Sequence, residues 1–356
     1  MAWLFLWAQP CLLFSDYVMM CTFFENPEAR VFNVSDEGSI NYEYSLTVTQ
    51  GASPESLVFS RNGKCGLVGV HTTYYPPTHI ITVLGVDNSD TISVLGTVHN
   101  ENEILVAISP DSKYGVYGRN LQTLRFNSDN TYELIPTENP NLSGIYGDFS
   151  SLSGNLITNS GYPGKKILEF TLLPDGRTTA TGVVVDISPS PGFQNVKVSP
   201  DGKTCIVLSI AEYNITSLRV NESGGFSIAQ QFHSQSSNPF DIGFTPDSKY
   251  VLISFIDDED GNIRSFQINE DSTLTLVDAI VLPYYPGEDM AVTPDGKFAI
   301  TRGLIQSKSY FDVVRIHEDG TLEYLPEKGY IDNLPVSDME FVPPQITAAG
   351  NTWLMY

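Results

Sequence analysis

The chain has 356 residues, and its 42 acidic side chains outnumber its 19 basic ones, which gives a formal net charge of −23 and an isoelectric point near 4.4. Such a surface repels phosphate, so the composition argues against partners such as nucleic acid or an anionic membrane, although acidity also serves solubility by itself. Hydrophobic residues make up 41% of the chain and aromatic residues 11%, which is enough for a packed core.

The chain begins with an apolar stretch, W-L-F-L-W-A-Q-P-C-L-L-F from Trp3. It is too short to span a bilayer, and the first basic residue of the chain is Arg30, so it lacks the basic start of a signal peptide. We therefore favour an extra strand or plug over residues 1–15, and the cytoplasm over secretion. Four N-glycosylation sequons do not change this view, because a chain so rich in Asn, Ser and Thr contains about that many by chance.

Four cysteines show no metal-ligand spacing. Cys65 and Cys205 fall within apolar strands, where we expect buried free thiols. Cys11 and Cys21 lie symmetrically about Asp16, so a hairpin turning there could join them in a disulfide. The favoured alternative is that both are buried free thiols.

One phrase recurs along the chain: a short apolar strand, then Ser or Thr, Pro, Asp, Gly or Ser, and Lys, then a second apolar strand. It is clearest at residues 289–302, returns near residues 105, 194 and 240, and is worn near residues 56, 146 and 338. Aligned copies place in register Arg61, Pro110, Ser151, Pro200, Pro246, Pro294 and Pro343, with steps of 49, 41, 49, 46, 48 and 49 residues. A fixed period in this range indicates a repeat architecture.

Each copy predicts one blade of a β-propeller. Proline presets the first turn position, Asp bonds the following backbone, and Gly accepts positive φ, so the phrase joins two antiparallel strands. A third strand, such as residues 263–268, and a fourth follow after a polar turn. Four antiparallel strands rich in β-branched and aromatic residues form a blade.

The number of copies predicts seven blades. Six full repeats run from about residue 56 to about residue 335. The N-terminal fragment supplies strands at 17–24, 29–34 and 39–48, and the C-terminal fragment supplies the first strand of the same blade at 338–342. We therefore predict an all-β, seven-bladed propeller whose ring is closed by pairing of the two chain ends, which buries the edges of an open sheet. No linker interrupts the repeats, so we expect one domain over residues 1–356, and a monomer.

The residue five positions before each turn proline begins the innermost strand at the mouth of the central channel, where a ligand would bind. These residues are Ser56, Leu105, Tyr146, Asn195, Asp241, Asp289 and Asp338. Carboxylates brought close together need a cation, a proton or backbone donors. Asp241, Asp289 and Asp338 are thus candidate ligands of Ca²⁺. We do not expect the protein to require a cofactor. The alternative is that each Asp caps its own strand.

A second set of polar residues lies where inner strands leave the body: His71, Arg119, Asn159 and Arg302. An arginine there could hold a carboxylate or phosphate, and a histidine could exchange protons near neutral pH. Each could instead be structural, and Arg302 could pair with Asp289 or Asp338. Motifs of serine hydrolases, zincins and nucleotide-binding loops are absent from the sequence.

The repeated turn phrase and strands such as residues 263–274 resemble the lactonase-type seven-bladed propeller family. This family includes 6-phosphogluconolactonase and the fungal carboxymuconate cyclase, and its turns are similar to those of surface-layer propeller repeats. The resemblance covers nearly the whole chain. It implies His or Arg at the start of innermost strands, positions that here hold Gln194 or Asn195 and Phe240 or Asp241. It also implies a Glu beyond a second strand, where Asp257 lies nearby, and an Arg closing a second strand, which Arg302 matches.

We therefore expect a lactonase-like or cyclase-like enzyme acting on a small polar lactone, derived from a sugar or an acid, at the channel mouth. Arginines would orient an anionic group, and carboxylates would serve as general base or hold a cation. The candidate catalytic residues are Arg302, Asp257, Asp289, Asp241, Asn195, His71 and Arg119.

Two alternatives stay open at this point. One is a non-catalytic propeller that binds a protein or glycan partner through its loops, which a mouth closed by Tyr74, Tyr75 and Tyr285 would favour. The other is a scaffold stabilised by calcium.

Overall fold

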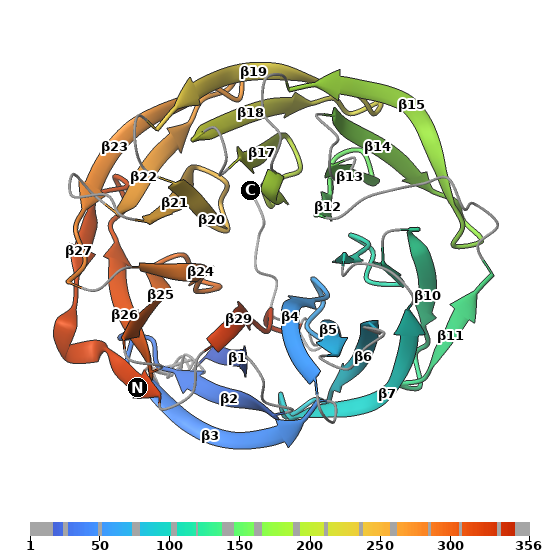
Figure 1. The fold of residues 1–356 in the computed structure, drawn as a ribbon, viewed down its shortest axis with the longest axis horizontal. Helices are drawn as coiled ribbons and strands as arrows, with labels where there is room; N and C mark the ends of the chain where they lie inside the picture. Colours follow the sequence, from blue (N-terminus) through green and yellow to red (C-terminus); the bar gives the residue numbers. More distant parts are fainter. Residues whose placement is uncertain are drawn as a thin grey trace, which may run out of the picture.

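The computed structural model describes residues 17–23, 28–48, 52–72, 79–100, 105–118, 120–136, 146–159, 166–187, 193–209, 213–234, 238–256, 262–283, 286–305, 308–332 and 336–345. Within them the chain forms seven antiparallel sheets arranged in a ring, each of them one blade of a β-propeller (Figure 1). The predicted seven-bladed, all-β fold is confirmed.

Each blade runs from an innermost strand near the ring centre to an outer fourth strand (Figure 1). Blade 1 contains β4 (Ala52–Phe59), β5 (Cys65–Thr72), β6 (His79–Val86) and β7 (Ile92–Asn100). Blade 2 contains β8 (Val106–Ile108), β9 (Tyr114–Tyr117), β10 (Gln122–Phe126) and β11 (Tyr132–Ile135). Blade 3 contains β12 (Gly147–Phe149), β13 (Asn155–Asn159), β14 (Lys166–Leu172) and β15 (Thr178–Asp186). Blade 4 contains β16 (Phe193–Val198), β17 (Thr204–Ser209), β18 (Asn214–Val220) and β19 (Phe226–His233).

Blade 5 contains β20 (Asn238–Phe244), β21 (Tyr250–Ile256), β22 (Ile263–Ile268) and β23 (Leu274–Ile280). Blade 6 contains β24 (Pro286–Val292), β25 (Phe298–Ile305), β26 (Lys308–Ile316) and β27 (Leu322–Tyr324), and a short 3-10 helix, η1 (Pro326–Lys328), leads to a fifth strand, β28 (Tyr330–Asp332), which also pairs with β26. Blade 7 contains β29 (Val336–Phe341), β1 (Tyr17–Phe23), β2 (Glu28–Val34) and β3 (Ile40–Thr47).

Blade 7 joins the two ends of the described chain. Its strand order is β29-β1-β2-β3, so the innermost strand comes from the C-terminal part and the other three from the N-terminal part. Strands β1 and β29 pair antiparallel, with Met19 opposite Phe341 and Thr22 opposite Asp338. The predicted closure of the ring is confirmed. The fifth strand of blade 6 was not predicted.

The turn phrase forms the bonds expected of it. In blade 6, Thr293 Oγ1 donates to Asp295 Oδ1 at 2.7 Å, and the same oxygen accepts the Lys297 N–H at 3.1 Å. Gly296 has φ +75°, the left-handed conformation that favours glycine. Equivalent bonds to aspartate recur in the turns of blades 2, 4 and 5.

The hydrophobic core lies between the blades. Seven buried clusters each draw side chains from two neighbouring blades, and the cluster between blades 6 and 7 contains Phe311, Phe32 and Met339. Burying such side chains contributes about 1.5–3 kcal/mol each, so the ring is held mainly by contacts between blades. Cys205 lies in one of these interfaces, and Cys65 and Cys205 are both buried free thiols, which confirms the prediction for both.

The predicted strand or plug over residues 1–15, and with it Cys11, lies outside the described residues. Within the described part of the chain, no helix has the length and apolar character that crossing a membrane requires.

Candidate active site

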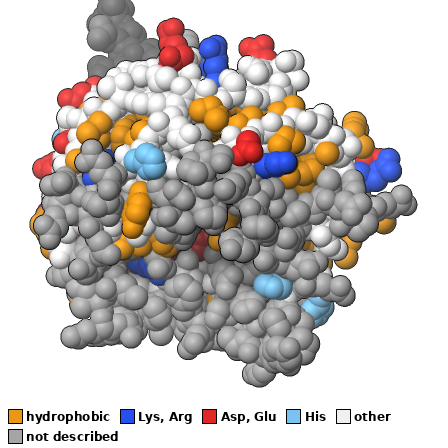
Figure 2. Space-filling model, turned by 45° about the horizontal axis from the view of Figure 1, so that its top comes forward, with side chains coloured by type: hydrophobic (Ala, Val, Ile, Leu, Met, Phe, Trp, Pro, Cys, Tyr) orange, Lys and Arg blue, Asp and Glu red, His pale blue; other side chains and the backbone are white. Residues whose placement is uncertain are grey.

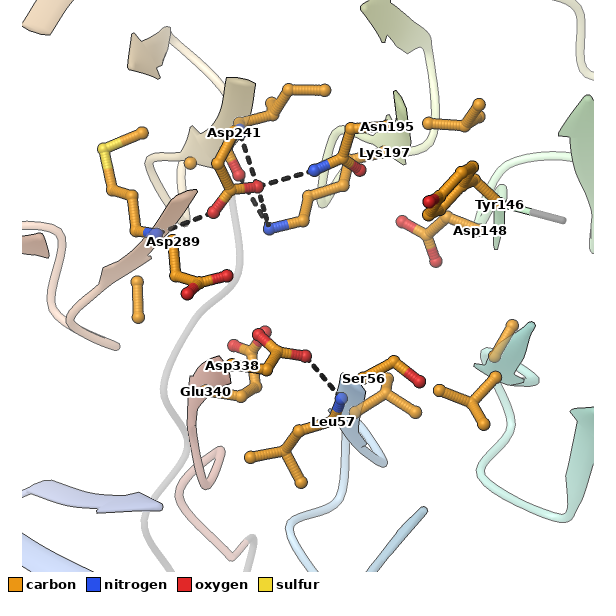
Figure 3. A pocket seen from close by; sticks show the side chains of 18 of the residues that line it. Ser56, Leu57, Tyr146, Asp148, Asn195, Lys197, Asp241, Asp289, Asp338 and Glu340 are labelled. Carbon is orange, nitrogen blue, oxygen red and sulfur yellow. Dashed lines mark hydrogen bonds and ion pairs between the residues drawn. The ribbon is translucent and has the colours of Figure 1, made fainter. Parts of the chain in front are cut away.

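The innermost strands surround one cavity of about 800 Å³ at the ring centre (Figure 3). All seven residues predicted to begin these strands at the mouth line it. We call this set the mouth ring: Ser56, Leu105, Tyr146, Asn195, Asp241, Asp289 and Asp338. The repeat alignment therefore identified one layer of the cavity wall.

A second layer lies two residues further along each innermost strand. We call it the inner ring: Val58, Ala107, Asp148, Lys197, Gly243, Ala291 and Glu340. Side chains alternate along a strand, so residues two apart face the same side. The sequence analysis missed Asp148, Lys197 and Glu340, although the same alignment, moved by two positions, would have found them.

Asp241 is the centre of the largest polar network in the cavity. Its Oδ1 accepts the Asn195 amide at 2.6 Å and lies 3.1 Å from Lys197 Nζ, which also donates to the Ile242 carbonyl at 2.9 Å. Figure 3 shows the Asp241, Asn195 and Lys197 side chains converging from blades 4 and 5. The lysine side chain is 33% exposed and the Asp241 side chain 7%, so the pair forms part of the cavity wall.

The carboxylates of both rings also accept backbone N–H groups from the next blade. Asp241 Oδ2 accepts the Met290 N–H at 2.6 Å, and Asp338 Oδ2 accepts that of Leu57. Asp148 Oδ2 accepts the Val198 N–H at 2.9 Å. An innermost strand has no strand partner on its channel side, so these carboxylates satisfy donors that would otherwise be unpaired. Asp241 and Asp338 also cap their own strands, as the alternative proposed: Asp241 Oδ1 accepts the Ile242 N–H at 2.7 Å and Asp338 Oδ1 accepts the Met339 N–H at 2.8 Å.

Two carboxyl groups of blade 7 resist ionisation. Removal from water raises the pKa of Glu340 to about 7, an increase that Lys197 opposes and Asp241 reinforces. Removal from water, together with the charge of Asp289, raises the pKa of Asp338 well above its usual range. At neutral pH the cavity therefore contains a carboxyl group, Glu340, that can both take up and release a proton.

Lys197 stays protonated. Burial alone would lower its pKa, but the charges of Asp241, Glu340 and Asp338 raise it above its ordinary value. A lysine in this state acts as a fixed cation and a hydrogen-bond donor, not as an amine nucleophile.

Arg302 lies elsewhere than expected. Its side chain is almost fully buried, its Nε lies 3.4 Å from Asp289 Oδ2, and it is not among the residues that line the cavity. Pairing of Arg302 with Asp289, the structural alternative, is confirmed. The position of Arg302 behind the mouth ring does not provide the predicted contact with an anionic substrate.

The calcium site predicted at Asp241, Asp289 and Asp338 is not formed. Among the described residues, no three His, Cys, Asp or Glu side chains are grouped so that they could hold a metal ion. The physical reason is that Asp241 and Asp338 direct their oxygens to backbone N–H groups and Lys197, and Asp289 faces Arg302.

Other candidates can be placed only in part. Asp257 and Arg119 lie outside the described residues, as do Tyr74, Tyr75 and Tyr285, and only the backbone of His71 is described, in β5. Asn159 is buried and its Oδ1 accepts the Tyr146 N–H at 3.0 Å, which is a structural role.

No protein-family model matches the chain, and no curated protein matches it in sequence. Solved structures are similar to it in three dimensions. A protein of Bacteroides uniformis, provisionally assigned as a 6-phosphogluconolactonase, is 19% identical with a TM-score of 0.75, covering 92% of this chain and 99% of that one. The chain has the fold of the lactonase-type propellers.

A second structure on the same fold is the periplasmic gluconolactonase of Pseudomonas aeruginosa, which is 14% identical with a TM-score of 0.73, covering 92% of this chain and 99% of that one. A third, from Bacteroides fragilis, is also provisionally assigned as a 6-phosphogluconolactonase and is 16% identical with a TM-score of 0.74, covering 94% and 99%. At these identities the likeness concerns the fold, and the predicted architecture of the lactonase-type propellers is confirmed.

Proposed function

We propose that this protein hydrolyses a small polar lactone in the cavity lined by the mouth and inner rings. A fold shared with a gluconolactonase and a cavity of about 800 Å³, within the range of small-molecule sites, support the proposal. The observation that carries it is that Glu340 and Lys197, an acid–base group and a fixed cation, line the same cavity.

In the proposed reaction, Glu340 acts as the general base. Its carboxylate takes a proton from water while the water oxygen attacks the lactone carbonyl carbon, and the carbonyl electron pair moves onto oxygen. The Lys197 ammonium would stabilise the resulting oxyanion. The intermediate then expels the ring oxygen, and the proton held by Glu340 passes to that oxygen, which leaves a hydroxy acid.

The mouth ring would position the substrate. Asp241 and Asn195 hold Lys197 in place through the contacts described above, so they act as positioning residues. The buried pair of Asp289 and Arg302 fixes the adjoining wall. A buried acid–arginine pair beside the cavity is the feature that favours an enzyme over a binding scaffold.

The experiment is a hydrolysis assay on a panel of sugar lactones with wild type, Glu340→Gln and Lys197→Met. We expect hydrolysis by wild type and a loss of about 10²–10⁴-fold in each variant. Lys249→Met, which removes an exposed turn lysine, is the matched control and should keep wild-type activity. Absence of hydrolysis by wild type across the panel, with folding verified by circular dichroism, would refute the proposal.

A further inference from the structure

The charges that line the cavity restrict the lactones it can take. Five carboxyl groups face it, from Asp148, Asp241, Asp289, Asp338 and Glu340, whereas Lys197 is the one Lys or Arg among the described lining residues. We infer that the cavity takes an uncharged, polyhydroxylated lactone and excludes phosphorylated or otherwise anionic ones. The inference rests on the proposed function and names the substrate class of the same site.

A bound phosphate needs several cationic or N–H donors at once. Lys197 has two of its three N–H groups occupied, by Asp241 and the Ile242 carbonyl, so it can serve one substrate oxygen and not a whole phosphate. Lys197 is paired with Asp241, and the Asn195 amide donates to the same carboxylate. The backbone N–H groups of Met290 and Leu57 donate to Asp241 and Asp338. A phosphate would therefore displace these contacts and meet the carboxylates of Asp241 and Asp289, which repel an anion.

Arg302 does not offset this charge. Arg302 is only 1% exposed and lies against Asp289, so its guanidinium is screened from the cavity by a carboxylate. Arg302 therefore provides no binding site for an anionic group of a ligand in the cavity.

The same wall suits sugar hydroxyl groups. Carboxylate oxygens accept hydrogen bonds from hydroxyls, and such charge-assisted bonds are stronger than neutral ones. The inner ring also leaves space, because Ala107, Gly243 and Ala291 contribute almost no side chain to the cavity. A compact ligand rich in hydroxyl donors fits this combination of acceptors and room.

The test compares two ligands that differ by one phosphate. Calorimetric titration of wild type with gluconolactam, an uncharged analogue that is not hydrolysed as a lactone, and with its 6-phosphate should show tighter binding of the uncharged ligand by about tenfold or more. Raising the salt concentration from about 0.01 M to about 1 M should bring the affinities of the two ligands closer together, because salt screens charge repulsion. Equal or tighter binding of the phosphorylated ligand, binding of neither, or tighter binding of an amino-sugar lactam would overturn the inference.

A variant tests the source of the selectivity. Asp289→Asn removes the carboxylate that covers Arg302, so we expect the 6-phosphate to gain affinity relative to the uncharged ligand. Asp319→Asn, the same change on an exposed turn, should leave the ratio unchanged. An unchanged ratio in folded Asp289→Asn would count against the inference, and if that variant does not fold, the salt dependence of wild type decides.

These outcomes can be separated from those of the proposed function. Tighter binding of the uncharged lactam without hydrolysis of any lactone would support the ligand class and refute the enzyme. Preferential hydrolysis of a phosphorylated lactone would support the enzyme and overturn the ligand class.

Discussion

Glu340 shows how one residue links stability and chemistry in this protein. Removal from bulk water, reinforced by Asp241 and opposed by Lys197, raises the pKa of its carboxyl group from 4.5 to about 7. The folded state therefore binds a proton more tightly than the unfolded state. A group suited to proton transfer near neutral pH is for the same reason a group that weakens the fold when it ionises.

A pH series tests this link. The contribution of Glu340 is fully present below pH 4.5 and is lost as pH rises through about 7, so the free energy of unfolding should fall over this window. A shift of this size, from 4.5 to about 7, corresponds to about 3.5 kcal/mol at most, at about 1.4 kcal/mol per pKa unit. Urea unfolding of Glu340→Gln should show a flatter profile, with a residual slope from Asp338. A slope equal to that of wild type would contradict the assignment.

The pair of Arg302 and Asp289 makes a second prediction at this scale. Removing one partner of a buried pair leaves an uncompensated charge, so Arg302→Met should lower the free energy of unfolding by about 3–5 kcal/mol. The double variant Arg302→Met/Asp289→Leu should recover part of this loss. Chemical denaturation of both variants checks it, and a double variant as unstable as the single one would show that the pair is not the cause.

Among the elements, the innermost strands depend on their neighbours. Each has a strand partner on one side only, and Asp148, Asp241 and Asp338 supply acceptors from the preceding blade. The outer strands use the same device, since Gln230 of β19 accepts the Leu274 N–H of β23, and Asp278 of β23 accepts the Leu322 N–H of β27. Polar side chains thus join blades that share no strand pairing.

The turns make a prediction of their own. Thr293 is fully buried, and its hydroxyl oxygen accepts the Phe298 N–H at 3.0 Å while donating to Asp295. Thr293→Val leaves that N–H without this acceptor and should lower the free energy of unfolding by about 1–3 kcal/mol, as measured by thermal denaturation. Thr131→Val, which removes a similar bond to Asp129 on an exposed hairpin, should cost less than about 0.5 kcal/mol. Equal losses would argue against burial as the cause.

The turn aspartates also determine how the free energy of unfolding decreases at low pH. Although burial favours the protonated form, hydrogen bonds from Thr293 and Lys297 lower the pKa of Asp295. Asp111 and Asp247 have lowered pKa values for the same reason. The contribution of these aspartates to the free energy of unfolding is present above pH 3.8, the ordinary pKa of Asp, and should be lost as the pH falls below that value.

At the scale of the whole molecule, the fold depends on closing the ring. Strand β29 covers β1 and contributes Met339 and Phe341 to the core between blades. A chain ending at residue 335 should expose this edge and lose cooperative unfolding in calorimetry. A truncated chain with the melting temperature of wild type would contradict this account of closure.

The sequence predicted most of the architecture because the turn phrase recurs in every blade. The fifth strand, β28, was missed because it is three residues long and has no counterpart among the described residues of the other blades. The mouth ring could be predicted, since its members occupy one repeat position. The pairing of Lys197 with Asp241 could not, because contacts between blades depend on how adjacent strands are inclined and not on spacing along the chain.

The excess of acidic residues has two locations with different consequences. On the face turned forward in Figure 2, acidic, basic and hydrophobic side chains of the described residues are interspersed, as expected of a solvated surface. In the cavity, by contrast, carboxyl groups are concentrated around one lysine. The overall charge favours solubility, and the local charge favours proton transfer and ligand selection.

The most direct measurement is the pH dependence of kcat/KM for hydrolysis of an uncharged sugar lactone by wild type and Glu340→Gln. With Glu340 as the base, wild-type activity should rise with pH up to about 7, where its carboxyl group ionises, and then level off. The variant should lose this rise together with about 10²–10⁴-fold of the activity. The same rise in both proteins would show that another group is the base and would contradict the account.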